Sequence, residues 1–291
     1  MPAVIGFFFR ILERLGVHLT PNHYHFPIPD TGRLPEALWS RQSGLPGLDM
    51  NVEGQLVLLD LLAERYGSEM AGLPRTAREA KSGFYLENRH FETVDAEIYY
   101  GLIRDRAPRR ILEVGSGFST RLALIALEKN RLDGRPGSIT LCDPEPPSWA
   151  KAGEGALERV ITARVQDLPL ETFTRLTASD MLFIDSSHVL AIGSDVQFLF
   201  LEVLPRLTPG VLVHVHDIFL PAEYPKYWVR DRLRFWNEQY LLQAFLALND
   251  RFRVTWASHW MALRHPERLA RAIPSFGPGR SPGSFWMERV S

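Results

Sequence analysis

Ile111-Leu-Glu-Val-Gly-Ser-Gly-Phe-Ser-Thr120 joins an apolar run to a glycine-rich turn. The apolar run predicts a short strand, Arg110–Val114, that delivers Glu113 to its carboxyl end. Gly115 and Gly117 then allow the backbone to approach a ligand closely, because a Cβ at either position would collide with it. This order of strand, acid and glycine turn predicts a pocket for a nucleoside-bearing cofactor.

A helix is expected directly after the turn and is predicted to run to about Lys129. Ser119 or Thr120 can cap it, since a hydroxyl oxygen accepts a hydrogen bond from the unpaired N–H groups of a first helical turn. Ser116, between the two glycines, and Ser119 are placed with the cofactor-binding residues. An ordinary strand–turn–helix unit with incidental glycines is the alternative for this segment taken alone.

Two other glycine-rich motifs fit the stretch less well. A dinucleotide-binding motif has a third glycine three residues after Gly117, and Thr120 stands there instead. A phosphate-binding loop needs a Gly-Lys-Ser/Thr triplet, which does not follow. Glu113 would repel a pyrophosphate but attract an ammonium or sulfonium group. The stretch therefore resembles motif I of the class I S-adenosylmethionine (SAM)-dependent methyltransferases, which implies a Rossmann-like sheet and methyl-transfer chemistry.

The composition of the chain argues against several classes of partner. Its net charge of −1 offers no basic stripe for phosphates, so nucleic acid is not expected as a partner. The single cysteine, Cys142, rules out an intrachain disulfide framework and fits a reducing, cytoplasmic environment. Arginine far outnumbers lysine, which suggests a bacterial genome rich in G and C.

No run of apolar residues reaches the roughly 18–20 that a membrane span requires. The N-terminal run Val4–Phe9 is short, and Arg10 and Glu13 follow it without a small-residue cleavage site. We therefore expect neither a signal peptide nor a membrane span. The segment is interpreted as an amphipathic helix packed on its own protein.

Two regions of the chain differ in their pattern of predicted secondary structure. Residues 1–104 combine helical patches with proline-rich loops and are expected to form a helical N-terminal extension or cap. Residues 105–291 alternate strand and helix signals and are expected to form the SAM-binding methyltransferase domain. The expected fold class is α/β, with a Rossmann-like seven-stranded methyltransferase sheet that is mostly parallel and has its last strand antiparallel.

The elements of this fold follow from hydrophobic periodicity. Strands are predicted at Arg110–Val114, Ser138–Cys142, Val160–Arg164, Met181–Ile184, Gly210–His216, Phe252–Ala257 and Ser284–Arg289. Further helices are predicted around Leu56–Leu62, Thr93–Ile103, Ser194–Pro205 and Arg230–Leu248.

Ligands of open α/β sheets bind beyond the carboxyl ends of the strands, where the second and third predicted strands place polar residues. Asp143 follows the second strand at about the spacing from Gly117 at which an acid binds both ribose hydroxyls. Its alternative role is that of a turn former. Gln166 and Asp167 follow the third strand, where an acid in related enzymes meets the adenine amine; a loop acid ahead of a helix is the alternative.

The fourth strand ends in Asp185-Ser-Ser-His188. A carboxylate at the end of a buried strand is costly unless a nearby group satisfies it, and the candidates for Asp185 are the sulfonium, a divalent metal and the acceptor. His188 is the expected general base, because neutral imidazole accepts a hydroxyl proton near pH 7. A loop histidine hydrogen-bonded to backbone is its alternative.

The fifth strand supplies His214, His216 and Asp217. The two histidines lie two residues apart and share one face of the sheet, and His214 is interpreted as a core residue. His216 is a catalytic candidate, and with Asp217 and Asp185 it offers ligands to Mg²⁺ or another divalent cation. Several metal-dependent small-molecule O-methyltransferases carry acids at the ends of these two strands. The likeness is partial, since a histidine replaces an acid here, so a metal is left open.

An aromatic loop after the fifth strand is the expected substrate side. Tyr224 and Trp228, with the prolines around them, predict a stiff loop that covers the methyl-transfer centre and excludes water. His25 is expected to reach the same mouth, and the alternative is that it only packs the extension on the sheet. Tyr224, Trp228 and His25 are therefore the candidate substrate-binding residues.

These patterns predict a SAM-dependent methyltransferase acting on a small-molecule or metabolite acceptor, with oxygen as the expected methylated atom. Phe84-Tyr-Leu-Glu-Asn88 and Trp236-Asn-Glu-Gln-Tyr240 are similar to segments of an uncharacterised bacterial branch of this family, which implies the same chemistry and names no acceptor. An NAD(P)-dependent oxidoreductase is one alternative, disfavoured by Glu113 and by the missing third glycine. A non-catalytic SAM- or nucleoside-binding module is the other. The acceptor, the pathway and a homo-oligomeric state are left open.

Overall fold

The computed structural model describes residues 2–151, 153 and 155–291, and the chain divides into two compact units. The smaller unit consists of Met1–Arg41 and Glu223–Phe235. The larger unit consists of Gln42–Ala222 and Trp236–Ser291. These bounds differ from the boundary expected at residue 104, and the cap role of residues 1–104 stays a prediction.

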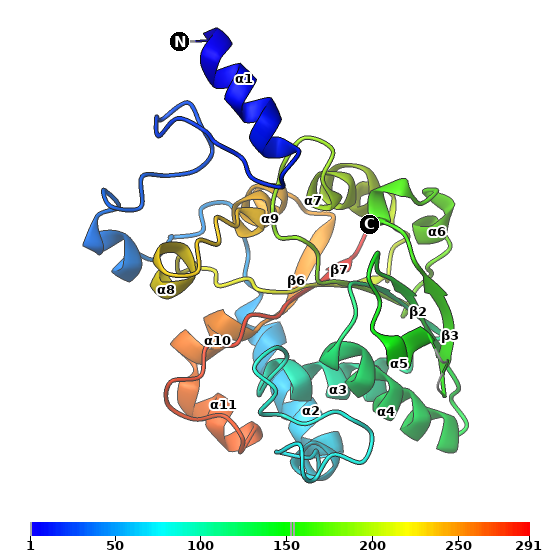
Figure 1. Cartoon of the computed structure of the whole chain (residues 1–291). Helices are drawn as coiled ribbons and strands as arrows, with labels where there is room; N and C mark the ends of the chain where they lie inside the picture. The colour runs from blue at the N-terminus through cyan, green and yellow to red at the C-terminus, as the bar shows by residue number, and fades with distance from the viewer. Residues whose placement is uncertain (1, 152, 154) are drawn as a thin grey trace. The chain divides into compact units, whose positions relative to one another are not determined.

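The larger unit is built on a seven-stranded sheet in the order β3–β2–β1–β4–β5–β7–β6 (Figure 1). The neighbours from β3 to β5 pair in parallel, and β7 is antiparallel to both β5 and β6. This topology confirms the predicted Rossmann-like methyltransferase sheet. The strands are β1 (Arg110–Val114), β2 (Ser138–Cys142), β3 (Leu157–Ile161), β4 (Met181–Ile184), β5 (Leu212–Val215), β6 (Phe252–Ala257) and β7 (Phe285–Arg289).

Helices cover both faces of this sheet (Figure 1). One face carries α2 (Val52–Ala71), α3 (Asp95–Arg106), α4 (Phe118–Leu132), α10 (Ser258–Arg264) and α11 (Pro266–Ala272), and the other carries α7 (Asp195–Phe198) and α9 (Glu238–Leu246). Side chains alternate along each strand, so Ile111 packs in the core under α3 while Leu112 and Val114 pack in the opposite core. By the same alternation Glu113 points to the α3 face, among buried apolar side chains.

Several predicted elements differ from the observed ones in their bounds, and the largest differences lie in β3, in Ser194–Pro205 and in Arg230–Leu248. β3 begins three residues before the predicted Val160, because pairing with β2 already starts at the carbonyl of Ala156. The segment Ser194–Pro205 is helical but changes from α7 to a π-helical turn, Leu199–Val203, and a short 3₁₀ turn, Leu204–Arg206.

The long helix predicted at Arg230–Leu248 does not exist. The structure has α8 (Lys226–Arg230) in the smaller unit and α9 in the larger one, with non-helical residues between them. Asn237, just before α9, donates its backbone N–H to the carbonyl of His188, a bond to a remote loop that the helical periodicity of the segment does not reveal. A tertiary contact therefore overrides the local helical pattern.

The smaller unit brings together two segments that are far apart in the sequence. It contains α1 (Pro2–Glu13), a 3₁₀ turn (Glu36–Ser40), and α8. Glu36 pairs with Lys226 at 2.7 Å and with Arg230 at 2.6 Å, and Arg230 also donates to the carbonyl of Leu34. Within the part of the chain that is described, no helix combines the length and apolar character needed to cross a bilayer.

Candidate active site

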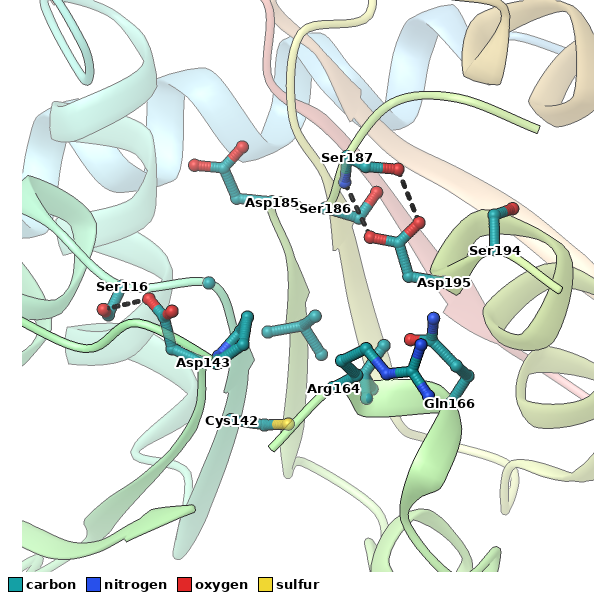
Figure 2. Close-up of a pocket in the computed structure, with 14 residues that line it drawn as sticks. Ser116, Cys142, Asp143, Arg164, Gln166, Asp185, Ser186, Ser187, Ser194 and Asp195 are labelled. Carbon is teal, nitrogen blue, oxygen red and sulfur yellow. Dashed lines mark hydrogen bonds between the residues drawn. The ribbon is translucent and has the colours of Figure 1, made fainter. Parts of the chain in front are cut away.

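A cavity of about 650 Å³ opens where β1, β2 and β4 end (Figure 2). This is the edge at which open α/β sheets bind their ligands. Figure 2 shows Ser116 and Asp143 on one side of it, with Ser187, Asp195 and Gln166 on the other. The lining residues are 114–116, 142–144, 164–166, 185–187, 194 and 195.

The two glycines of the turn after β1 serve different purposes. Gly115 has a φ of +88°, and a Cβ at this position would lie 2.4 Å from the backbone oxygen of Asp185. The close approach of the β1 and β4 ends therefore requires glycine. Gly117 has an extended backbone, and a Cβ built there meets nothing within 4 Å. Its missing side chain leaves open space at the turn, which a bound ligand can use.

Glu113 is a fully buried carboxylate with one oxygen free to accept. Its Oε1 accepts a hydrogen bond from Ser119 Oγ at 2.5 Å, while Oε2 has no partner among the described residues. Burial raises the pKa of Glu113 to about 8, against the opposing effects of the Ser119 and Thr120 hydroxyls. A cation or an N–H donor placed beside Oε2 would satisfy the open acceptor and favour the ionised form.

The helix after the turn begins at Phe118, with Gly117 as its capping residue. Ser119, one of the two predicted caps, instead donates to Glu113. The hydroxyl of Thr120 accepts from the backbone N–H of Gly117 at 3.1 Å and so steadies the turn. The helix runs to Leu132, slightly beyond the predicted end.

Asp143 lies across the turn from Ser116 at the cavity edge (Figure 2). Ser116 Oγ donates to Asp143 Oδ2 at 2.5 Å, and the backbone N–H of Glu145 donates to Asp143 Oδ1 at 2.8 Å. Asp143 thus forms the turn expected of an acid in this position and also lines the cavity. Each carboxylate oxygen keeps a further lone pair that can accept from a ligand hydroxyl.

The segment that follows β3 contributes Arg164 and Gln166 to the cavity wall. The guanidinium of Arg164 donates to both oxygens of Asp167, at 2.9 and 3.0 Å. Gln166 donates its amide to the carbonyl of Gly193. Of the two residues predicted here, Gln166 lines the cavity, whereas the carboxylate of Asp167 is engaged with Arg164.

A buried histidine surrounded by carboxylates stands at the ends of β4 and β5. His188 Nδ1 lies 2.9 Å from Glu238 Oε2, and the side chain of Glu238 is completely buried. On the opposite edge of the ring, Nε2 lies 3.3 Å from Asp185 Oδ1 and 3.7 Å from Asp217 Oδ2. Three carboxylates from three segments of the chain therefore converge on one imidazole.

The charges of this cluster compensate one another. Burial lowers the pKa of His188, but the hydrogen bonds to Asp185 and Glu238 outweigh it and hold the pKa well above the ordinary value. Burial likewise opposes ionisation of Asp185, yet the hydrogen bond from His188 leaves its pKa below the ordinary value. In the ligand-free protein these contacts favour the protonated form of His188.

The two histidines of β5 differ in their surroundings. His214 is buried in the core as expected, stacked 3.8 Å from the ring of Phe183, and burial lowers its pKa well below the ordinary value. His216 lies at the strand end, with Nε2 3.6 Å from Asp217 Oδ1 and a buried Nδ1 that has no partner among the described residues. Only His216 belongs to the charged cluster.

Backbone conformation at this cluster is uncommon for residues with side chains. His188 has a φ of 62° and Asp217 a φ of 56°, both in the left-handed region. Such conformations cost about 1–3 kcal/mol each and persist where surrounding contacts enforce them, often at functional sites.

The three predicted metal ligands lie near one another, but their donor atoms face other partners. Asp185 and Asp217 direct oxygens at His188 Nε2, and His216 Nε2 faces Asp217. Across the described ranges of the chain, no group of three or more His, Cys, Asp or Glu side chains is placed to hold a metal ion. As arranged here, this donor set does not fit a divalent cation.

Sequence reasoning missed Glu238 and Asp195. Glu238 lies 50 residues after His188, inside a segment that had been interpreted as the middle of a helix. Asp195 accepts from the backbone N–H and the hydroxyl of Ser187, at 2.8 and 2.6 Å, and lines the cavity. Asp195 stands at the start of a predicted helix, and this position could have indicated it. For Glu238 the sequence offered no indication other than the family-like segment around it.

The predicted substrate-binding residues Tyr224, Trp228 and His25 all belong to the smaller unit. Their contribution to substrate binding stays a prediction.

Comparison with known proteins finds a matching domain in part of the chain. A family model described as a methyltransferase domain matches residues 112–218, the segment from Leu112 of β1 to the residue after Asp217. An uncharacterized protein of Archaeoglobus fulgidus is 29% identical over 172 residues, which cover 56% of this chain and 76% of that protein.

Two solved structures with a distant likeness carry methyltransferase names. An O-methyltransferase from Bacillus cereus in complex with SAH is 15% identical, with a TM-score of 0.41 over 79% of this chain and 91% of that one. CalS11, a TDP-rhamnose 3′-O-methyltransferase of calicheamicin biosynthesis, is 14% identical, with a TM-score of 0.42 over 79% of this chain and 93% of that one.

The matched segment contains the motif I turn, every strand that borders the cavity, and the acids at the strand ends. The sheet has seven strands, is mostly parallel and has its last strand antiparallel, as the resemblance to motif I predicts. Residues 112–218 of this chain therefore match a methyltransferase domain.

Proposed function

We propose that the enzyme methylates a hydroxyl group of a small-molecule acceptor and that His188 is the general base. The observation that carries the proposal is the orientation of His188. Glu238 holds its Nδ1, while its Nε2 faces Asp185 and Asp217 at the strand ends. A base for a hydroxyl group needs a nitrogen near the cofactor cavity, and Asp185, which His188 Nε2 faces, lines that cavity.

The cofactor side of the site fits SAM. The open Oε2 of Glu113 suits an ammonium group, Asp143 offers acceptors to ribose hydroxyls, and the free space at Gly117 admits a ligand against the backbone. Asp185, between this side and His188, suits the neighbourhood of a positive charge. When bound, SAM supplies a methyl group already activated on a sulfonium, so positioning and exclusion of water supply most of the catalysis.

His188 handles the proton of the reaction. As the acceptor oxygen forms its bond to the methyl carbon, the bond from that carbon to the sulfonium sulfur breaks and leaves a neutral thioether, and the hydroxyl proton passes to Nε2 of neutral His188. The raised pKa of His188 means that the ring first has to lose the proton that it holds in the ligand-free protein. A positive charge arriving beside Asp185 favours that loss, because it takes over the compensation of this carboxylate.

A divalent metal has no step in this proposal. Mg²⁺ would have to displace His188 from both Asp185 and Asp217 to gain their oxygens, and the observed donor set does not fit it. The negative charge of the carboxylates is compensated by histidines instead.

The proposal is tested by incubating the protein with SAM labelled in the methyl group and a panel of small phenols, sugars and amines. We expect label in products whose methyl resonance is that of an O-methyl ether, and none in the amines. Transfer confined to nitrogen or carbon acceptors would refute the assignment to oxygen. No transfer from SAM to any acceptor, together with NAD(P)H formed from a panel alcohol when NAD(P)⁺ replaces SAM in the incubation, would favour the oxidoreductase alternative.

A further inference from the structure

Glu238 is the first residue of α9, and its side chain is completely buried. Its Oε2 lies 2.9 Å from His188 Nδ1, and its Oε1 accepts from Ser186 Oγ at 3.1 Å. Burying a carboxylate is costly unless its partners repay the lost hydration. Burial indeed raises the pKa of Glu238, with the hydrogen bond from His188 opposing that rise. An apolar residue would begin the helix without this cost.

The residues beside Glu238 hold the loop that carries His188. The backbone N–H of Asn237 donates to the carbonyl of His188 at 3.1 Å, and its side-chain oxygen accepts from the N–H of Leu190 at 2.6 Å. The ring of Trp236 lies 4.2 Å from the imidazole. Residues 236–238 therefore fix both the backbone and the ring of a histidine whose φ is 62°.

A neutral imidazole has one N–H and one lone pair, and its hydrogen-bond partners decide which nitrogen carries each. A carboxylate only accepts, so Glu238 at 2.9 Å requires a proton on Nδ1, as Asp185 at 3.3 Å requires one on Nε2 while the ring is charged. When the ring loses one proton, the shorter bond to the completely buried Glu238 retains the proton on Nδ1, whereas the more exposed Asp185 can turn to another partner. The lone pair then lies on Nε2, on the side of Asp185 and Asp217. That is the side on which the proposed function needs a base.

We infer that Glu238 is a positioning residue for methyl transfer: it selects the tautomer of His188 that leaves Nε2 free to accept the acceptor proton. The inference rests on the proposed function, because it assigns a partner to the proposed base. Glu238 acts through His188 and does not touch the reacting atoms.

Glu238→Gln is the discriminating substitution, because it keeps the shape of the side chain and reverses its hydrogen bonding to the ring. The amide can still accept from Ser186, but its NH₂ donates to Nδ1 and so places the histidine proton on Nε2. We expect kcat to fall by about 10²–10⁴-fold, with KM for SAM and acceptor changed only a few-fold. In the ¹⁵N spectrum of the neutral ring, the His188 resonances should exchange from the Nδ1–H to the Nε2–H pattern.

Controls separate this role from a structural one. Glu202→Gln makes the same chemical change on an exposed carboxylate that pairs with Arg206, and it should leave kcat unaltered. Glu238→Asp keeps a carboxylate and should retain the Nδ1–H pattern with more activity than Glu238→Gln. If Glu238→Gln fails to fold, the Asp variant decides: loss of its Nδ1–H pattern would contradict the inference.

His188→Asn distinguishes the two levels of the proposal. If His188→Asn is inactive while Glu238→Gln keeps full kcat, the proposed base stands and the role of Glu238 is refuted. An unchanged tautomer in folded Glu238→Gln would refute it equally. If His188→Asn is as active as the wild type, the proposed base and its positioning residue fall together.

Discussion

The two sides of the candidate site are constructed in opposite ways. The cofactor side, Glu113, Gly115, Gly117 and Asp143, comes from the ends of two adjacent strands, and one buried carboxylate oxygen there has no partner in the described chain. The base side, Asp185, His188, Asp217 and Glu238, comes from three distant segments, and its carboxylates already share an imidazole. The cofactor side therefore lacks a positive charge that a ligand can supply, whereas on the base side the histidine supplies one.

Because of this difference, the cofactor side should determine the affinity for the ligand and the base side should determine the turnover rate. An uncompensated carboxylate weakens the ligand-free protein and strengthens the complex with a cationic ligand. A compensated cluster is stable without ligand and has to give up a proton before it can act as a base. Substitutions on the two sides should therefore change different measurements.

The largest effect is expected on the base side. His188→Asn should lower kcat by about 10²–10⁴-fold because it removes the proton acceptor, while the dissociation constant for SAM changes only a few-fold. In the wild type, kcat at saturating substrates should rise with pH around a midpoint above the ordinary histidine value, since the raised pKa keeps the ring protonated at lower pH. A pH-independent kcat in the wild type would contradict the assignment, as would a variant that loses SAM binding instead of turnover.

Glu113→Gln should have opposite effects on stability and binding. The raised pKa of about 8 means that protonated Glu113 favours folding below pH 4.5, and this contribution is lost as pH rises from 4.5 through about 8. The neutral amide avoids the loss, so the ligand-free variant should be more stable than the wild type at pH 8 by roughly 2–4 kcal/mol.

Urea unfolding at pH 5 and pH 8, with and without SAM, measures both effects of Glu113→Gln. The gain in stability should shrink at pH 5, and SAM should stabilise the variant less than the wild type. A variant that is destabilised at pH 8 would show that Glu113 serves the fold and not the ligand.

The cofactor side could be predicted from the sequence to a greater extent than the base side. The strand, glycine turn and helix from Arg110 onward are local in sequence, so periodicity and motif located them, and the same holds for Asp143 after β2. Glu238 was missed because its partner lies 50 residues away and because its segment has helical periodicity. The start of β3 was misplaced because pairing with β2, not local composition, sets its first residue.

Substitution of each glycine of motif I by alanine gives two variants that can be compared directly, and their expected effects are of intermediate size. Gly115→Ala places a Cβ 2.4 Å from the Asp185 backbone oxygen at a φ of +88°, so it should disturb both sides and destabilise the fold by about 1–3 kcal/mol. Gly117→Ala meets nothing within 4 Å and should leave stability nearly unchanged, yet weaken SAM binding by filling ligand space. Thermal unfolding and SAM titration of both variants check this. Equal loss of stability in the two would remove the distinction.

The smallest effect is expected from removal of divalent cations. Because histidines compensate the carboxylates of the base side, methyl transfer should persist after treatment with a chelator and passage over a desalting column. The measurement is the methyl-transfer activity before the chelator treatment, after it, and after Mg²⁺ is added back. Loss of activity that Mg²⁺ restores would show that Asp185 and Asp217 turn from His188 to a metal.

Calorimetric titration of the wild type and Asp143→Ala with SAM and with NAD⁺ tests the central claim most directly, namely that the carboxylates at the ends of β1 and β2 receive a cationic adenosyl ligand. The wild type should bind SAM with one site per chain and give no signal with NAD⁺, and Asp143→Ala should bind SAM about 1–3 kcal/mol more weakly through loss of the ribose hydrogen bonds. Binding of NAD⁺ without SAM, or an unchanged SAM affinity in Asp143→Ala, would contradict it.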